Sequence, residues 1–155
     1  MVQIPFYSGN IEPDEKTIFV FGSNLEGRHG AGAAKVAREV FGAQYGIGEG
    51  LTGNSYALPT KDLRVTKNKG LRSISEEDIV RSISRLYETA RNNSDRDFKV
   101  AYRNTVRTSL NGYTGIEMIH MFISAGQIPE NIIFSQEWIE TGLLKKEQYE
   151  KYKME

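Results

Sequence analysis

Residues 18–34 constrain the fold most, because an apolar run leads directly into a glycine-rich turn and then into a helical pattern. The run 18–21 (Ile-Phe-Val-Phe) is typical of a strand that is buried on both faces. Gly27, Gly30 and Gly32 follow it, and glycine lets the backbone adopt crowded or left-handed conformations close to a ligand. Apolar residues then recur at helical spacing from Ala33. The unpaired N–H groups of that helix are expected to point into the turn, where an anion can bind.

Glycines in such a turn can also serve only to pack a strand tightly against a helix, and this alternative stays open. Three polar side chains favour a binding site, because Asn24, Arg28 and His29 all lie in the turn at the carboxyl end of the strand. Open α/β sheets place their ligands at that end. The glycine spacing matches neither the dinucleotide fingerprint nor the P-loop, so both of those classes are set aside.

Several segments carry a resemblance to a known family. They are Gly9-Asn10-Ile11-Glu12, the strand end Gly22-Ser23-Asn24, the turn Gly30-Ala31-Gly32-Ala33-Ala34, the segment Ser109-Leu110-Asn111-Gly112-Tyr113-Thr114-Gly115, and the strand Asn131-Ile132-Ile133-Phe134. Here the chain resembles the macrodomain superfamily, which binds ADP-ribose, and in particular a bacterial and phage branch of it. The most specific part is the string from Phe21 to Gly30. The resemblance implies a three-layer α/β/α sandwich with a mixed sheet.

The resemblance also implies the residues of the site. Those expected to bind the ligand are Asn10, Gly22, Ser23, Arg28, Gly30, Ala31, Gly32, Asn111, Gly112, Tyr113 and Thr114. Asn24 would hold the distal ribose, as the matching asparagine of the family does. From its own chemistry, His29 would transfer a proton, and Asp62 would orient or activate a water molecule if the loop after the strand 55–58 reaches the site. Two departures point to a smaller or altered ADP-ribose derivative. Asn10 stands where the family has an aspartate that binds adenine, and Arg28 with His29 interrupts the run of glycines.

Each of these side chains also has a structural interpretation. Asn24 can cap the turn by binding backbone groups, and His29 can make a loop hydrogen bond. Arg28 can be a solvated loop residue, and Asp62 an ordinary turn residue. Tyr113 can pack against Met118 as a hydrophobic staple.

Length and composition narrow the classes of protein. The chain has 155 residues, so we expect one domain over residues 1–155. Lys plus Arg and Asp plus Glu number 20 each, which argues against general nucleic-acid or membrane binding. Cysteine is absent, which suits a reducing compartment, and the N-terminus resembles neither a signal peptide nor a membrane span. A cytoplasmic protein is therefore expected, with its oligomeric state left open.

The remaining pattern predicts alternating strands and helices. Strands are expected at 2–7, at 55–58 before Pro59, at 98–102 and at 131–134, and residues 46–53 and 63–72 are expected to form loops. Helices are expected from 33, from Ser75 to Asn92 and from Thr114, with a further polar helix at 147–153. Ser75 with Asp78, and Thr114 with Glu117, each have the spacing of a capping box. This alternation indicates an α/β domain.

The leading hypothesis is that the chain binds ADP-ribose or a related NAD-derived nucleotide and hydrolyses its ribosyl or phosphate ester bond. The alternative is a module that binds such a nucleotide without catalysis, because the fold alone does not choose between them. No metal ligand cluster or cofactor motif is visible. A structural or nucleic-acid-associated phage-type protein fits the balanced charge least well.

Overall fold

The computed structural model describes residues 6–30, 32–68, 70–101 and 111–140. The strands are β1 (Thr17–Asn24), β2 (Gly50–Thr52), β3 (Ser55–Lys61), β4 (Asp97–Val100) and β5 (Ile132–Ile133). The helices are α1 (Gly32–Val40), α2 (Glu76–Arg91), α3 (Gly115–Ser124) and the short α4 (Glu137–Glu140). These elements form an α/β fold, as the alternating pattern predicted. The proposed terminal helix at 147–153 lies outside the described residues.

The strands form one mixed sheet in the order β2-β3-β1-β4-β5. β1 lies at its centre and runs parallel to β3 on one side and to β4 on the other. β5 continues the parallel set, whereas β2 pairs with β3 in the antiparallel direction. Of the first predicted strand, at 2–7, only Phe6 and Tyr7 lie within the described residues, and Tyr7 forms an isolated parallel bridge with Ser135.

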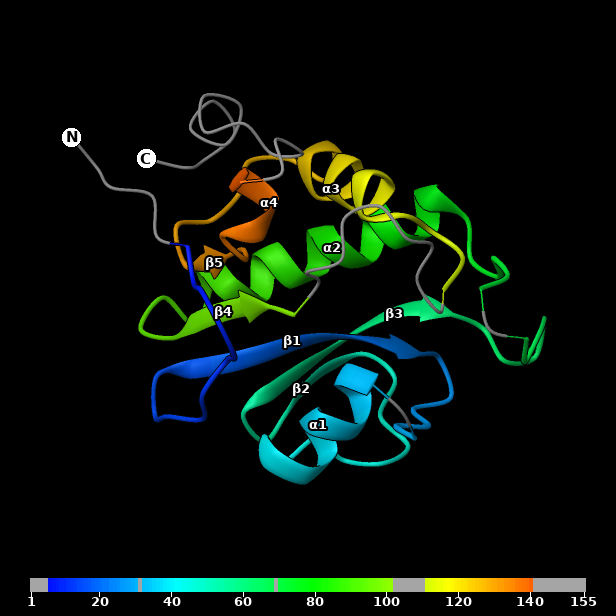
Figure 1. Ribbon diagram of the computed structural model, residues 1–155, viewed down its shortest axis with the longest axis horizontal. Coiled ribbons are helices and arrows are strands. Elements are labelled where there is room, and N and C mark those ends of the chain that lie inside the picture. Colours follow the sequence, from blue (N-terminus) through cyan, green and yellow to red (C-terminus); the bar gives the residue numbers. More distant parts are fainter. Residues whose placement is uncertain (1–5, 31, 69, 102–110, 141–155) are drawn as a thin grey trace.

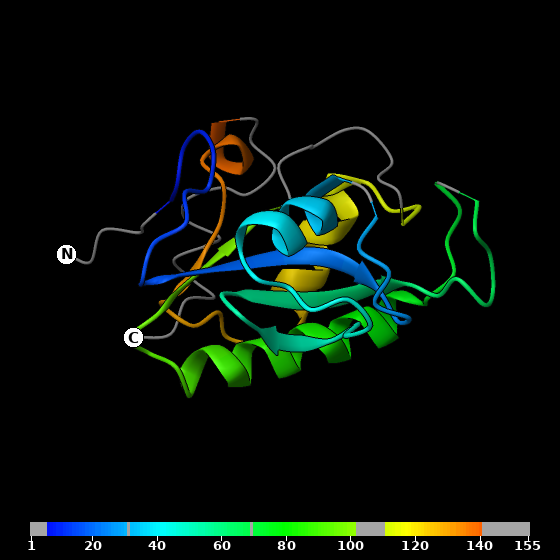
Figure 2. The same cartoon turned by 90° about the horizontal axis from the view of Figure 1, so that it is seen from below.

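The two faces of the sheet bury different apolar side chains. Ile18 and Val20 of β1 join a core with α2 and α3, whereas Phe19 and Phe21 join a second core with Ala37 of α1. This division follows from strand geometry, because successive side chains point to opposite faces. Figure 1 shows the result, with α1 below the sheet and with α2 and α3 above it. Viewed from the α1 side, this helix lies in front of β1 (Figure 2).

Both predicted helix starts above the sheet are confirmed, although their caps differ. The Thr114 side chain accepts the Glu117 N–H and the Glu117 carboxylate accepts the Thr114 N–H, so α3 has a complete capping box. At α2 the Ser75 hydroxyl accepts the Asp78 N–H, but the Asp78 carboxylate is paired with Arg81. The box predicted at Ser75 is therefore half formed.

The structure corrects the prediction around β3. The strand continues through Pro59 to Lys61, because β2 pairs only with Ser55, Tyr56 and Ala57 and leaves Pro59 on a side where no partner strand needs its N–H. Residues 46–53 contain β2 rather than only a loop. The two-residue Gly53-Asn54 connection is a hairpin signal that the sequence already carried.

The segments that follow the central strands leave the sheet toward opposite faces. The segment after β1 leads to α1 below the sheet, whereas those after β3 and β4 lead to α2 and α3 above it (Figure 1). In open α/β sheets, ligands bind at such a switch point, outside the carboxyl ends of the strands. In both ribbon views the segment after β3 extends beyond this carboxyl end (Figures 1 and 2).

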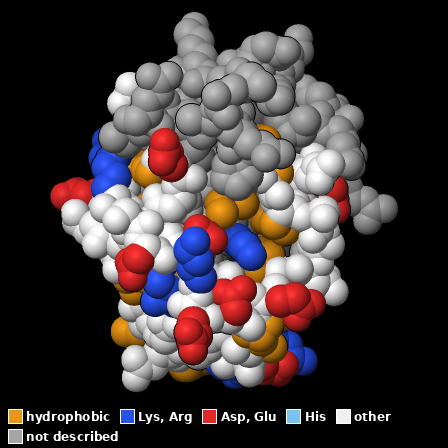
Figure 3. All heavy atoms as spheres, turned by 90° about the vertical axis from the view of Figure 1, so that its left-hand side faces the viewer, with side chains coloured by type: hydrophobic (Ala, Val, Ile, Leu, Met, Phe, Trp, Pro, Cys, Tyr) orange, Lys and Arg blue, Asp and Glu red, His pale blue; other side chains and the backbone are white. Residues whose placement is uncertain are grey.

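The opposite end of the sheet carries no single-sign surface. Figure 3 faces the amino ends of the parallel strands and shows acidic and basic side chains interspersed among the atoms it colours. In the described part of the chain, no helix combines the length and apolar character that crossing a bilayer requires.

Candidate functional site at the carboxyl end of β1

The first turn of α1 differs electrostatically from those of α2 and α3. α2 carries three acidic residues in its first turn and α3 carries Glu117, whereas α1 has none. The residue before α1 is Ala31, which has no side-chain oxygen to cap the helix; its placement lies outside the described residues. The positive end of the α1 dipole is therefore not offset by an acid of its own first turn.

The glycines of the turn have different roles. A Cβ at Gly27 would lie 2.3 Å from the Gly46 carbonyl carbon, and one at Gly48 would lie 2.3 Å from the Leu25 oxygen. These two glycines therefore let the segments 24–30 and 44–48 pack on each other, which is the packing role that the sequence left open. By contrast, a Cβ at Gly30 or Gly32 would meet no atom of the described residues within 4 Å.

Gly30 and Gly32 still differ in backbone conformation. Gly32 has φ +58°, a left-handed value that disfavours any side chain, whereas Gly30 does not lie in the left-handed region. Gly30 can therefore be substituted without backbone strain, whereas Gly32 cannot.

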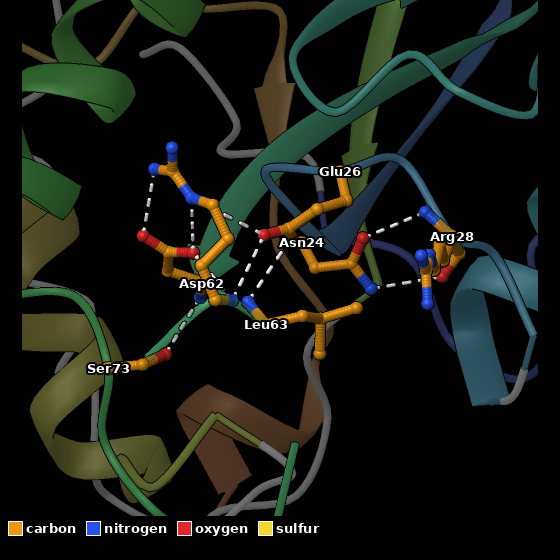
Figure 4. A network of polar contacts seen from close by, with 7 residues as sticks. Asn24, Glu26, Arg28, Asp62, Leu63 and Ser73 are labelled. Atoms are coloured by element: carbon orange, nitrogen blue, oxygen red, sulfur yellow. Dashed lines mark hydrogen bonds and ion pairs between the residues drawn. The ribbon is translucent and has the colours of Figure 1, made fainter. Parts of the chain in front are cut away.

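Asn24 closes the turn through backbone contacts. Its Nδ2 donates to the Arg28 carbonyl oxygen at 3.0 Å, and its Oδ1 accepts the Arg28 N–H at 2.8 Å (Figure 4). The structural role proposed for Asn24 is thus present, and both ends of its amide are engaged. The Arg28 side chain is exposed and makes no ion pair with any other described residue.

His29 is fully buried beneath the turn. Its Nε2–H donates to the Ile47 carbonyl oxygen at 3.1 Å, which leaves Nδ1 as a buried acceptor without a partner among the described residues. The ring meets Phe21 edge-on, with ring centroids 5.2 Å apart. Burial lowers the His29 pKa below its usual value, and the bond to Ile47 opposes this only in part. The loop hydrogen bond that was the alternative to catalysis is therefore present.

Asp62 follows β3 and is held by Arg64. The Arg64 side chain donates to both carboxylate oxygens at 3.0 Å, and these hydrogen bonds, opposed by partial desolvation, lower the pKa of Asp62 to about 2 (Figure 4). Glu26 joins this group, because its carboxylate accepts the backbone N–H groups of Leu63 and Arg64. An aspartate with so low a pKa is a weak base at neutral pH.

The second glycine-containing segment packs on the chain itself. A Cβ at Gly112, where φ is +89°, would lie 2.6 Å from the Arg72 nitrogen, and the Gly112 oxygen accepts the Arg72 Nε–H at 2.9 Å. Asn111 is buried and accepts the Tyr113 N–H. Tyr113 is also buried, and its hydroxyl donates to the Ile74 carbonyl oxygen.

Thr114 serves as the helix cap described above, so residues 111–114 are all engaged in contacts within the protein. Residues 102–110 lie outside the described part of the chain.

Three further predicted positions complete the set. Ser23 is buried and its hydroxyl donates to the Gly48 carbonyl oxygen, whereas Gly22 beside it is half-buried. Asn10 is exposed and makes no hydrogen bond within the described residues.

The structure thus brings the predicted residues of β1 and its turn together with Asp62, through Glu26. Ser73, which precedes α2, accepts the Asp62 N–H (Figure 4). The neighbouring Arg72 contacts Gly112. Two contributors were not foreseen, Glu26 and Arg64, because only the tertiary fold brings the two segments together. No cluster of three metal-ligating side chains occurs within the described ranges.

The fold is that of an open α/β protein in which α1, the helix that follows the central strand β1, has no acidic residue in its first turn. Searches against protein-family models, curated proteins and solved structures found no match to this chain.

Proposed function

We propose that this protein binds a phosphate-bearing nucleotide of the ADP-ribose type, with the phosphates at the N-terminus of α1. The observation that carries the proposal is the switch of sheet face at β1: the connection after β1 leads to α1 on one face, whereas those after β3 and β4 lead to helices on the other. Open α/β sheets bind ligands at such a switch point, outside the carboxyl ends of the strands. We further propose that the α/β fold is a three-layer, macrodomain-like sandwich, which is what the resemblance implies.

The charges around the helix end support an anionic ligand. Arg28 precedes α1 and is exposed, and the fourth residue of the helix is Lys35. Cations near a helix N-terminus are unfavourable unless an anion offsets them, because the helix dipole has the same sign there. Lys35 is partly offset by Glu39, at 4.0 Å, but the exposed Arg28 guanidinium remains available for a phosphate.

Between the two functions considered, the geometry favours binding without hydrolysis. His29 is enclosed, the Asn24 amide is engaged at both ends, and Asp62 is held by Arg64. None of these three groups offers a free base beside the open space at Gly30. The nucleotide-binding module is therefore the form of the proposal that we carry forward.

The test substitutes Gly30. Because Gly30 has no left-handed φ and a Cβ there meets open space, Gly30→Val should fold normally while its methyl groups fill the phosphate position. We expect calorimetric titration to detect binding of at least one ligand among ADP-ribose, ADP-ribose 1''-phosphate, AMP and NAD. Gly30→Val should strongly reduce the affinity for that ligand. His120→Ala is the control, because His120 is exposed on α3.

Failure of all four ligands to bind at millimolar concentration would refute the proposed function. If Gly30→Val and His120→Ala reduce the affinity equally, the proposal that the phosphates bind at the N-terminus of α1 is refuted. Gly32→Val is unsuitable as the main variant, because the φ of +58° strains any side chain whether or not a ligand binds there.

A further inference from the structure

Exposed apolar side chains gather beside the turn that precedes α1. Tyr45 is 59% exposed, and it is the one aromatic residue among the exposed large apolar side chains of the described segments. Leu25 and Ile47 are also exposed. The backbones of the two segments touch, because Gly48 packs directly against Leu25. Tyr45, Leu25 and Ile47 are therefore exposed apolar residues on two segments that touch each other just before α1.

The segment that carries Tyr45 is fixed to the turn by several contacts. The Gly46 N–H donates to the Gly27 oxygen at 2.9 Å, and the His29 Nε2–H donates to the Ile47 oxygen at 3.1 Å. The Ser23 hydroxyl donates to the Gly48 oxygen. Because these bonds tie both sides of Tyr45 to the β1–α1 turn, the exposed ring is held at a defined place rather than on a free loop.

The Tyr45 ring lies next to the residue that precedes the open glycine. Its centroid is 6.3 Å from that of His29, with the two planes 72° apart, and His29 is followed directly by Gly30. The two rings thus meet in a T-shaped contact, while 59% of the Tyr45 surface remains exposed. A large exposed aromatic surface beside an anion-binding position has the chemistry needed to bind a base attached to a phosphate.

We propose that Tyr45 is the stacking platform for the nucleobase of the bound nucleotide, with Leu25 and Ile47 flanking the base. This inference rests on the proposed function, because it takes the phosphates to lie in front of α1. The base would approach the exposed face of the ring, and stacking tolerates different bases because every base has a π-face.

A free nucleotide and the phosphorylated 5' end of a single strand share this chemistry. The balanced charge of the chain, with 20 basic and 20 acidic residues, favours the free nucleotide, because strand binding needs a basic groove that follows the backbone. A 5'-phosphorylated oligonucleotide is therefore included as a separate arm of the test.

The experiment compares Tyr45→Ala and Tyr45→Phe with Val65→Ala, which shortens an exposed apolar side chain of the segment after β3. Titrations use ADP-ribose and AMP, which carry a base, and ribose 5-phosphate and inorganic pyrophosphate, which do not. We expect Tyr45→Ala to weaken the base-containing ligands by about five- to a hundredfold, the usual scale for one stacked base. Tyr45→Phe and Val65→Ala should retain affinity, and pyrophosphate should bind equally to all.

The outcomes separate the two proposals. Unchanged affinity of ADP-ribose and AMP in Tyr45→Ala overturns the stacking platform while leaving the phosphate position intact. Absence of binding by every ligand refutes the proposed function itself. Tighter binding of the oligonucleotide than of AMP would overturn the free nucleotide as ligand.

A second variant keeps the inference testable if Tyr45→Ala is unstable. Tyr45→Trp adds an exposed indole to a chain whose single tryptophan, Trp138, is fully buried. Stacking of a base should quench the added fluorescence, whereas Val65→Trp should not respond. Equal responses of the two variants would overturn the inference.

Discussion

At the scale of the residue, burial explains why the His29 imidazole makes a structural hydrogen bond within the protein. Its imidazole is enclosed and donates from Nε2 to the Ile47 carbonyl oxygen, and desolvation lowers its pKa. A sequence shows that a histidine lies in a glycine-rich turn, but not which atoms surround the ring. The choice between a loop hydrogen bond and proton transfer therefore required the tertiary fold, which brings residues 44–48 over the turn.

The lowered pKa of His29 predicts a pH-dependent stability. Its folded-state pKa lies below the unfolded value of 6.5, so the unfolded chain takes up a proton first as the pH falls. The free energy of unfolding should therefore decrease once the pH drops below about 6.5. His29→Gln retains a donor for Ile47 but does not titrate, so it should lose this decrease in melts between pH 7.5 and 5.

His120→Ala is the matched control, because His120 is exposed on α3 and should leave the decrease in place. The same pH profile in His29→Gln as in the parent protein would contradict this assignment. The carboxylates whose pKa values are lowered, such as Asp62, do not interfere, because they protonate only in more acidic solution.

Asp62 gives a second residue-scale prediction. The hydrogen bonds from Arg64 lower the pKa of Asp62 to about 2, so Arg64→Ala should raise it toward 3.8. Carboxyl chemical shifts followed by NMR during an acid titration measure the change. Arg81→Ala, which removes the partner of Asp78 on α2, should leave the Asp62 midpoint in place. If Arg64→Ala does not move that midpoint, the Arg64 side chain is not what lowers the pKa.

At the scale of the element, helix caps were the most predictable feature, because they depend on residues three positions apart. The complete box at Thr114 and Glu117 was predicted and is confirmed. The half-formed box at Ser75 was overestimated, because Asp78 pairs with Arg81 instead. The extension of β3 through Pro59 could not be foreseen, since it depends on where β2 ends beside it.

The cap of α3 can be tested by substitution. Thr114→Ala removes the side chain that accepts the Glu117 N–H and should lower the free energy of unfolding by about 1 kcal/mol. Thr89→Ala, the same substitution inside α2, should cost less, because the Thr89 hydroxyl bonds the Arg85 carbonyl oxygen within its own helix. Denaturant unfolding of both variants provides the comparison. Equal losses would mean that the Thr114 cap adds nothing.

The cationic start of α1 leads to a prediction about affinity. Because Arg28 is exposed and lacks an ion-pair partner among the described residues, Arg28→Glu should leave stability almost unchanged. Arg28→Glu should reduce the affinity for a phosphate-bearing ligand by about tenfold or more, since a charge-assisted hydrogen bond contributes roughly 1.5–3 kcal/mol. Lys16→Glu reverses a charge just before β1, at the opposite end of the sheet. If both variants weaken binding equally, the effect reflects net charge and not a local contact.

At the scale of the whole molecule, the sequence predicted the alternation of strands and helices but not the order of strands. That order places β1 between β3 and β4, and the connections then leave the sheet toward opposite faces. The position of this switch point depends on long-range strand pairing, which a local pattern does not encode. Tyr45 was not predicted for the same reason, because its neighbour His29 is 16 positions away in the sequence.

The distinction between binding and hydrolysis also belongs to this scale, because it depends on how the segments enclose one another. With His29, Asn24 and Asp62 each engaged within the protein, we expect a nucleotide to bind without being consumed. At a hundred times its dissociation constant, a ligand specific for the folded state should add about 2.7 kcal/mol and raise the melting temperature by several degrees. Recovered ADP-ribose or ADP-ribose 1''-phosphate, quantified by ³¹P NMR after prolonged incubation, should be intact.

Turnover that disappears in His29→Gln would contradict this expectation. It would require the turn to open during the reaction, because the imidazole must leave the Ile47 oxygen and the Tyr45 ring to reach a ligand. Hydrogen exchange at the Gly46 N–H, which bonds the Gly27 oxygen across the two segments, measures that opening directly. If the protein is a binding module in which this turn stays closed, the Gly46 N–H should exchange slowly, and bound ligand should slow the exchange further.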